Sequence, residues 1–205
     1  MSKGIIIYAL AWLVFAVFHS WLARLTVQQH LESYLGKTYR FVYNIVAVVQ
    51  IGLVYMTGRA VLSTVKFPIL DQIVISVAGA MLQLAGLVII LYALRFYDLG
   101  RFSGLTQLVT GERLSAAAAE PLQMNGLNRL VRHPLYTGAF LVLWGGATTS
   151  IGLWTAVWGT LYFLIGTLFE ERKLTRLYGE EYIQYQQQIP RYFPRLSWRR
   201  GSSNL

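Results

Sequence analysis

Apolar residues in this chain gather into five long runs that polar segments separate. Each run approaches or exceeds the roughly 20 residues that a helix needs to cross a bilayer. The runs are Ile5–Leu22, Phe41–Leu62, Ile69–Leu94, Tyr136–Ser150 and Gly152–Phe169. We therefore predict an all-α integral membrane protein with about five transmembrane helices. The last two runs are short and almost touch, which predicts a tight helical hairpin whose ends depend on neighbouring protein.

The composition supports a membrane protein and removes several kinds of chemistry. Hydrophobic residues make up 55% of the 205 residues and charged residues only 13%, which is unusual for a soluble domain. The chain has no cysteine, so disulfides, thiolate nucleophiles and cysteine-based metal sites are excluded. The histidines are dispersed at His19, His30 and His133, so no metal site is expected. No small-residue cleavage site follows Leu22, so the first run is read as a retained helix.

Lysine and arginine are distributed unevenly between the two sides of the predicted bundle. With the N-terminus outside, the outer side holds Lys3, Arg59 and Lys66, and the inner side holds all the others among the 18 basic residues. The positive-inside rule then makes 23–40, 95–135 and 170–205 cytoplasmic, including a C-terminal helical tail. The net charge of +9 fits contact with anionic membrane lipids and requires no nucleic acid.

The chain is predicted to form a single domain in four parts. Three transmembrane helices (1–94) precede a cytoplasmic connector (95–135), a helical hairpin (136–169) and a cytoplasmic tail (170–205). The run Ala116–Ala119 favours a short surface helix or ordered loop in the connector, interrupted by Pro121 and Gly126. Such a long connector is either a lid or cofactor-binding element, or a simple tether.

Polar chemistry is concentrated around the predicted hairpin. Arg132-His133-Pro134-Leu135-Tyr136-Thr137-Gly138 precedes it, and Glu170-Glu171 ends it. Tyr178-Gly179-Glu180-Glu181-Tyr182 and Pro190-Arg191 follow in the tail. Ionisable groups at the edge of apolar spans are costly to keep there, so these blocks indicate a functional site.

These four ordered blocks resemble the isoprenylcysteine carboxyl methyltransferase and phospholipid methyltransferase superfamily. The resemblance covers about 126–195. Shorter patterns in the N-terminal half are similar to bacterial methanethiol S-methyltransferases and to NnrU-like membrane proteins. These patterns are His19-Ser20-Trp21-Leu22-Ala23, Tyr39-Arg40-x-x-Tyr43-Asn44, and 98–107 with Gly104-Leu105-x-Gln107.

The resemblance implies a methyltransferase domain of a bacterial inner membrane that uses S-adenosylmethionine from the cytoplasm. The acceptor, a small thiol or a lipid-like molecule, would arrive through the membrane. The residues expected to bind the cofactor are Arg132, His133, Tyr136, Gly138, Glu170, Glu171, Tyr178, Tyr182 and Arg191. A sulfonium cation, an amino-acid zwitterion, a ribose and an adenine together need carboxylates, donors and aromatic walls, which these residues supply.

Structural interpretations compete at several of these positions. His133 could simply bond to backbone where a helix starts, with Pro134 at its first position. Gly138 could serve helix packing. We expect Glu170 and Glu171 at the C-terminal end of a helix, where the helix dipole disfavours them and calls for a specific partner. Tyr178, Tyr182 and Tyr185 would share one helical face, either packed on the protein or lining the cofactor pocket.

Four residues near the inner ends of the first two helices are candidates for catalysis. His19, Arg40, Tyr43 and Asn44 could line an acceptor chamber and assist deprotonation of a thiol or bind an anion. They could equally form interhelical hydrogen bonds or boundary anchors.

Three other functions stay open at this stage. An isoprenylcysteine-type carboxyl methyltransferase tends to carry a basic residue before the glutamate pair, where this chain has Phe169. Membrane sterol reductases, which use NADPH, share the Arg-His-Pro motif but lack the Glu-Glu-x-x-Leu arrangement. A non-catalytic NnrU-like membrane protein is the third.

Overall fold

The computed structural model describes residues 2–62, 72–111 and 122–195, and its regular structure there is entirely helical. Five long helices form the body: α1 (Ser2–Leu22), α3 (Tyr39–Val61), α4 (Gln72–Leu94), α7 (Pro134–Gly145) and α8 (Ser150–Tyr178). The shorter helices are α2 (Leu25–Leu35), η1 (Gly36–Thr38), α5 (Leu99–Ser103), α6 (Leu105–Thr110), η2 (Gly126–Arg129) and α9 (Glu180–Gln188). The all-α prediction is confirmed for these residues.

The described residues hold four helical segments long and apolar enough to cross a membrane, where the apolar runs predicted about five. They are Lys3–Leu22, Leu25–Val61, Ile73–Leu94 and Ser150–Tyr178. The fourth predicted run forms α7, which has only 12 residues. At 1.5 Å per residue it extends about 18 Å, well short of a hydrocarbon core of about 30 Å. It is therefore too short to cross the hydrocarbon core by itself.

Two expectations about the last helix are wrong. We expected the last helix to end with its apolar run at Phe169, but α8 continues to Tyr178. Glu170 and Glu171 therefore lie inside a helix, and the helix-dipole argument does not apply to them. Tyr178 ends α8, and Gly179 (φ 58°) turns the chain before α9 begins. Tyr178 therefore does not share a helical face with Tyr182 and Tyr185. A glycine at positive φ ends helices readily, and here it divides the predicted tail helix.

Helices α1, α3 and α8 pack around an aromatic core. Tyr8, Trp12 and Phe15 of α1 are buried against Val54 of α3 and Ile151 of α8. The Tyr8 hydroxyl hydrogen-bonds the Thr155 hydroxyl at 2.8 Å. Burying polar groups in apolar surroundings is favourable only when they are paired, so this bond fixes how α1 meets α8.

Helices α4 and α7 approach closely through glycines. A Cβ atom on Gly138 of α7 would lie 2.7 Å from the carbonyl oxygen of Gly86, and one on Gly145 would lie 2.5 Å from that of Gly79. Small residues that let helix backbones approach are typical of packing within membranes. The contacts of Gly138 with α4 therefore match the interpretation that this glycine serves helix packing.

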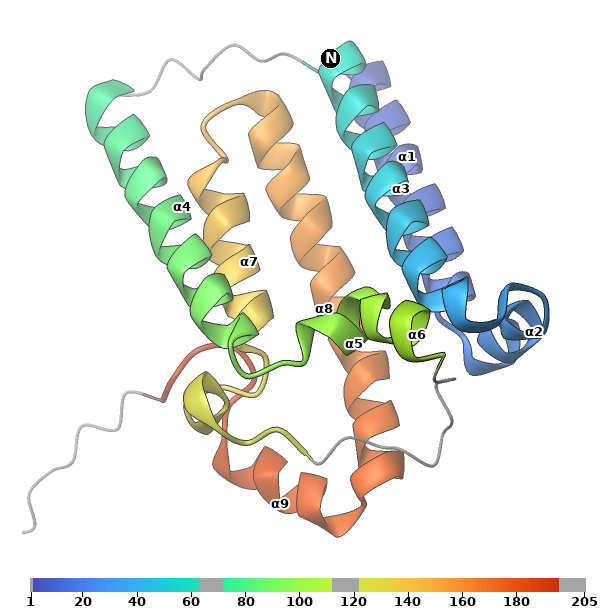
Figure 1. Ribbon diagram of the computed structural model, residues 1–205. Coiled ribbons are helices and arrows are strands. Elements are labelled where there is room, and N and C mark those ends of the chain that lie inside the picture. Colours follow the sequence, from blue (N-terminus) through green and yellow to red (C-terminus); the bar gives the residue numbers. More distant parts are fainter. Residues whose placement is uncertain (1, 63–71, 112–121, 196–205) are drawn as a thin grey trace, which may run out of the picture.

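The polar connections gather at one end of the helical body (Figure 1). There α5 and α6 cross in front of α8, α9 follows the end of α8, and α2 lies beside the ends of α1 and α3, all opposite the end at which α1 begins and α3 ends. Helix α2 was not anticipated from the apolar runs, since it is amphipathic and short. Several residues named in the sequence analysis lie outside the described residues: Lys66, Ala116–Ala119 and Pro121.

Candidate functional site

A buried carboxylate joins the start of α7 to the C-terminal segment. Glu171, whose side chain is 4% exposed, accepts hydrogen bonds at Oε1 from Arg132 Nε (2.9 Å) and Nη2 (2.6 Å). Its Oε2 accepts from Arg191 Nε (2.9 Å) and Nη2 (2.8 Å). His133 Nε2 lies 3.1 Å from Oε1, and Gln186 Nε2 donates to Oε2 at 3.3 Å. We call Arg132, His133, Glu171, Gln186 and Arg191 the Glu171 clasp.

The backbone reinforces the Glu171 clasp. The amides of Arg132 and His133 donate to the carbonyl oxygens of Pro190 (2.8 Å) and Arg191 (3.0 Å). Arg132 Nη1 also donates to the carbonyl oxygen of Gln186 at 3.0 Å. Two arginines at one carboxylate leave no buried charge uncompensated, which is the condition for such a group to be tolerated. The clasp thus holds the chain after α9 against the start of α7.

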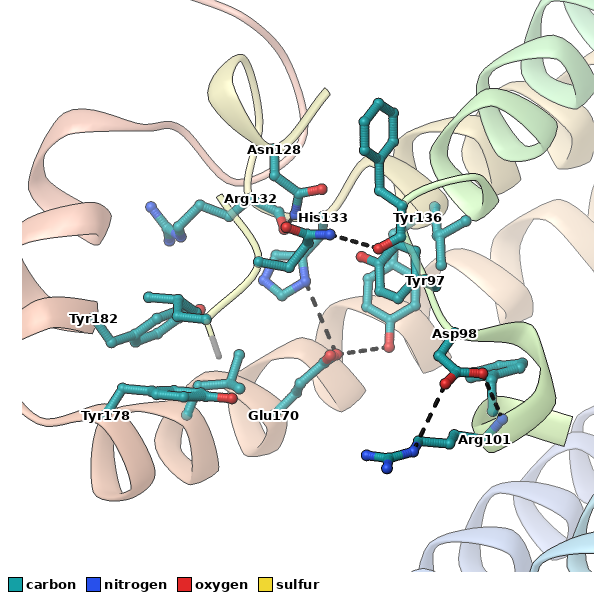
Figure 2. A pocket seen from close by; sticks show the side chains of 16 residues that line it. Tyr97, Asp98, Arg101, Asn128, Arg132, His133, Tyr136, Glu170, Tyr178 and Tyr182 are labelled. Atoms are coloured by element: carbon teal, nitrogen blue, oxygen red, sulfur yellow. Dashed lines mark hydrogen bonds and ion pairs between the residues drawn. The ribbon is translucent and has the colours of Figure 1, made fainter. Parts of the chain in front are cut away.

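A pocket of about 640 Å³ opens beside the clasp, which is within the range for small-molecule sites. Its walls come from 96–102 on one side, from the start of α7, and from α8 and α9 on the other. Figure 2 shows Asp98 and Arg101 on one side, Tyr178 and Tyr182 on the opposite side, and Glu170 between them. The pocket lies at the end of the body where the polar connections gather.

Glu170 is the carboxylate that faces this pocket. Its side chain is 42% exposed, ten times the fraction of Glu171. Tyr136 donates its hydroxyl to Glu170 Oε2 at 2.7 Å, and His133 Nδ1 lies 3.9 Å from the same oxygen. The rings of His133 and Tyr136 stack with centroids 5.4 Å apart. His133 therefore lies beside both glutamates, and the described residues bond Glu170 only at Oε2, which leaves Oε1 for a ligand.

Aromatic side chains line the pocket together with Glu170. Phe96, Tyr97, Phe102, Tyr178 and Tyr182 line the pocket with Tyr136. Tyr182 is buried, and its hydroxyl has no hydrogen-bond partner within the described part of the chain. Burial and the nearby Glu171 carboxylate raise the pKa of Tyr182, so the hydroxyl stays a donor at neutral pH. Such rings can stack on a base or hold a cation over their faces.

The structure brings six of the nine predicted cofactor residues to the pocket wall. Arg132, His133, Tyr136, Glu170, Tyr178 and Tyr182 line it. Glu171 and Arg191 instead belong to the clasp, and Gly138 faces α4. The sequence argument did not single out Tyr97, Asp98, Arg101, Gln123 or Asn128 as wall residues. The pattern at 98–107 in the sequence was one signal for this segment, and Asp98 caps α5 by accepting from the Arg101 amide.

Two of the four catalytic candidates form a separate pair. Tyr43 Oη lies 2.9 Å from His19 Nε2, which joins α3 to α1. His19 Nδ1 is buried, with no hydrogen-bond partner among the described residues. Neither residue lines the pocket, but a chain of ring contacts leads there from His19. Ring centroids are 6.1 Å apart for His19 and Tyr162, 5.7 Å for Tyr162 and Phe163, and 5.0 Å for Phe163 and Tyr136.

The other two candidates, Arg40 and Asn44, anchor the segment that carries Phe102. Asn44 Nδ2 donates to the carbonyl oxygens of Phe102 (3.0 Å) and Ser103 (2.9 Å). Arg40 Nε donates to the Phe102 carbonyl oxygen at 3.2 Å, and its guanidinium lies 5.9 Å from the centroid of the Phe102 ring. The anchoring interpretation of both residues matches these contacts.

Comparison with known proteins gives relatives of one kind. Methanethiol S-methyltransferase 1 of Bradyrhizobium diazoefficiens is 30% identical over 204 residues, which cover 98% of this chain and 69% of that protein. The methanethiol S-methyltransferase of Pseudomonas deceptionensis is 37% identical over 79 residues, or 38% of this chain and 30% of that protein. The methanethiol S-methyltransferase of Mycobacterium tuberculosis is 30% identical over 92 residues, which cover 44% of this chain and 38% of that protein. No family model and no solved structure matches the chain.

Proposed function

The chain belongs to the methanethiol S-methyltransferase family, and we propose that it transfers a methyl group from S-adenosylmethionine to a small thiol at the pocket beside the Glu171 clasp. The observation that carries this proposal is the part of the pocket formed by Glu170, Tyr136, Tyr178 and Tyr182, which we call the Glu170 wall. An available carboxylate, a positioned tyrosine hydroxyl and several aromatic faces meet in a pocket of about 640 Å³ at one end of membrane-spanning helices.

The residues of the pocket fit this methyl donor. Bound there, it would supply a methyl group on a sulfonium cation. The aromatic faces of Tyr136, Tyr178 and Tyr182 suit that cation and the adenine ring. The Glu170 carboxylate can accept hydrogen bonds from ribose hydroxyls or an ammonium group. The Tyr182 hydroxyl, which no described residue hydrogen-bonds, can donate to an acceptor on the ligand once the side chain turns toward it.

The residues that the resemblance implied for the cofactor then take two roles. His133, Tyr136, Glu170, Tyr178 and Tyr182 contact the donor. Arg132, Glu171 and Arg191 position the C-terminal segment that closes the pocket, and Gly138 positions the start of α7 against α4. Positioning matters for this reaction, because a displacement at carbon depends on alignment and on exclusion of water more than on covalent help.

The acceptor must lose a proton before or during the reaction. A new bond forms between the thiol sulfur and the methyl carbon while the bond from the methyl group to the sulfonium breaks, and the thiol proton needs a base. His19 supplies one, since no described residue bonds its buried Nδ1 while Nε2 meets the Tyr43 hydroxyl. We propose that the thiol reaches the pocket along the aromatic residues that lie between His19 and Tyr136.

The alternatives differ in acceptor or cofactor. The relatives are named for a thiol substrate, which favours a small thiol over a prenylcysteine carboxylate or another lipid-like acceptor. The same names disfavour an NADPH-dependent reductase and a non-catalytic role.

We further place the pocket on the cytoplasmic side of a bacterial inner membrane, with the N-terminus outside. The uneven distribution of basic residues and the common end of α2, α5, α6 and α9 support this. The chain has no cysteine, so single cysteines can be introduced without background. A cysteine at Ser33 should react with an impermeant maleimide only after cells are opened, and one at Lys3 in intact cells. The reverse pattern would overturn the orientation.

The function is tested with purified protein, S-adenosylmethionine labelled with tritium in the methyl group, and a series of thiols. We expect a volatile labelled sulfide from methanethiol or ethanethiol, and little label transferred to a prenylcysteine or with NADPH added. Glu170→Gln should abolish most of the product. Glu180→Gln, the same change at an exposed residue of α9, should not. Label transferred only to a prenylcysteine, or no transfer at all, would contradict the proposal.

A further inference from the structure

One wall of the pocket is a strap that the sequence argument did not assign to the site. The strap consists of α5 and α6 with Asp98 before them and extends over 98–110. It crosses the end of the helical body in front of α8 (Figure 1). Three of its residues, Asp98, Arg101 and Phe102, line the pocket.

The strap is fixed to α3. Asn44 donates to two successive carbonyl oxygens of the strap, those of Phe102 and Ser103. At Gly104 (φ 88°) a Cβ atom would lie 2.5 Å from the backbone nitrogen of Phe41, so only glycine permits this approach. Two amide hydrogen bonds and a backbone contact fix the strap's position relative to the body.

The strap presents opposite charges side by side. Asp98 Oδ2 lies 3.7 Å from Arg101 Nε, and the two side chains are 50% and 40% exposed. Asp98 Oδ1 also accepts from the Arg101 amide at 2.9 Å. An exposed ion pair at this distance contributes little to stability, so a ligand can replace it at little cost.

The other charged groups of the wall are arranged differently. Arg132 is 7% exposed, and its guanidinium donates to Glu171 and to backbone carbonyl oxygens. Glu170 shares its wall with the Tyr136 hydroxyl and the His133 ring. Among the described wall residues, accessible charges of both signs therefore lie together only on the strap.

We propose that the strap binds the amino-acid end of the methyl donor, with Asp98 accepting from the ammonium group and Arg101 donating to the carboxylate. The proposal rests on the function proposed above and specifies which wall holds which end. A zwitterion needs neighbouring groups of opposite charge, which the strap provides. Glu170, which lies between Asp98 and the tyrosines Tyr178 and Tyr182 (Figure 2), then serves the nucleoside end.

The test compares two ligands that differ only at the amino-acid end. S-adenosylhomocysteine carries the zwitterion, and 5′-methylthioadenosine lacks it. Calorimetry on the full chain in detergent should show that Asp98→Asn weakens binding of S-adenosylhomocysteine about 10- to 100-fold, as for loss of a charged hydrogen bond. Binding of methylthioadenosine should change less than about twofold. Asn caps helices as well as Asp, so this variant retains the strap's local fold.

Two further variants distinguish the amino-acid end of the ligand from its nucleoside end. Asn44→Leu removes two of the hydrogen bonds that anchor the strap and should weaken binding of S-adenosylhomocysteine selectively, as Asp98→Asn does. Glu170→Gln should weaken both ligands, because both carry the nucleoside. Equal weakening of both ligands by Asp98→Asn, or no weakening of either, would overturn the proposal. If the wild-type chain binds neither ligand, the proposed function itself fails, which is a different result.

Discussion

The Glu171 clasp and the Glu170 wall are adjacent on one helix turn, yet their chemistry differs. Both oxygens of Glu171 are occupied by arginines, and its side chain is 4% exposed. Glu170 is 42% exposed and bonded at one oxygen by Tyr136. Two identical side chains, one residue apart, thus point about 100° apart around the axis of α8 and meet different surroundings. Adjacent glutamates of one motif can therefore have different roles: one carboxylate stabilises the fold, and the other faces a ligand.

The largest expected effect comes from breaking the clasp. Glu171→Gln leaves the buried Arg132 without its charged partner, which should lower the free energy of unfolding by about 3–5 kcal/mol. Thermal unfolding in detergent and protease cleavage after α9 would measure it. Glu180→Gln is the matched control and should change the unfolding free energy by less than about 0.5 kcal/mol. An unchanged unfolding temperature for Glu171→Gln would contradict the structural role of the clasp.

Glu170→Gln should have the opposite profile. The substitution removes a charged acceptor from the pocket, so binding of S-adenosylhomocysteine should weaken about 10- to 100-fold. The unfolding temperature should stay near that of the wild type, because Glu170 is only partly buried. Calorimetry and thermal unfolding on one preparation measure both properties. If this variant unfolded as readily as Glu171→Gln, the division between the two carboxylates would be wrong.

Gly138→Ala tests whether this family-motif residue acts through packing. A methyl group there would meet the Gly86 carbonyl oxygen and Ile90 of α4, so we expect a loss of about 1–3 kcal/mol in unfolding free energy. The matched control is Gly166→Ala on α8, where a Cβ atom meets nothing within 4 Å. That change should leave stability equal or slightly higher. A stable Gly138→Ala variant that loses only ligand binding would assign Gly138 to the pocket.

The smallest effect should come from Tyr136→Phe. The change removes one hydrogen bond to Glu170 and keeps the ring that stacks on His133. We expect donor binding to weaken about 2- to 10-fold, the value for a single hydrogen bond of about 0.5–1.5 kcal/mol. Tyr55→Phe, on α3 and outside the pocket wall, is the matched control, since Tyr55 is 54% exposed. An equal loss of binding for Tyr55→Phe would contradict a specific role of the Tyr136 hydroxyl.

The sequence predicted the helical class and the gathering of Arg132, His133, Tyr136 and Glu170, because apolar runs and ordered motif blocks carry that information locally. It did not predict where α8 ends, since the apolar run stops at Phe169 while the helix continues through charged residues. It also could not distinguish Glu170 from Glu171. Their roles depend on which side of α8 the C-terminal segment covers, which is a tertiary property.

The strap shows a second limit of the sequence. Contacts with α3 hold Asp98 and Arg101 at the pocket, among them the hydrogen bonds from Asn44, more than 50 residues earlier, to the carbonyl oxygens of Phe102 and Ser103. No local pattern encodes that contact. Arg40 and Asn44 look like site residues in the sequence because they are polar groups beside a span, and their partners are visible only in the fold.

The most direct test of the account is to locate the bound donor. Tritiated S-adenosylmethionine would be cross-linked to the wild-type chain and to Glu170→Gln by ultraviolet light, and the labelled peptides identified by mass spectrometry. We predict label on peptides that contain Tyr136, Tyr178 or Tyr182, strongly reduced in the variant. Label on α1 or α3, or equal labelling of the variant, would contradict a donor site at the Glu170 wall.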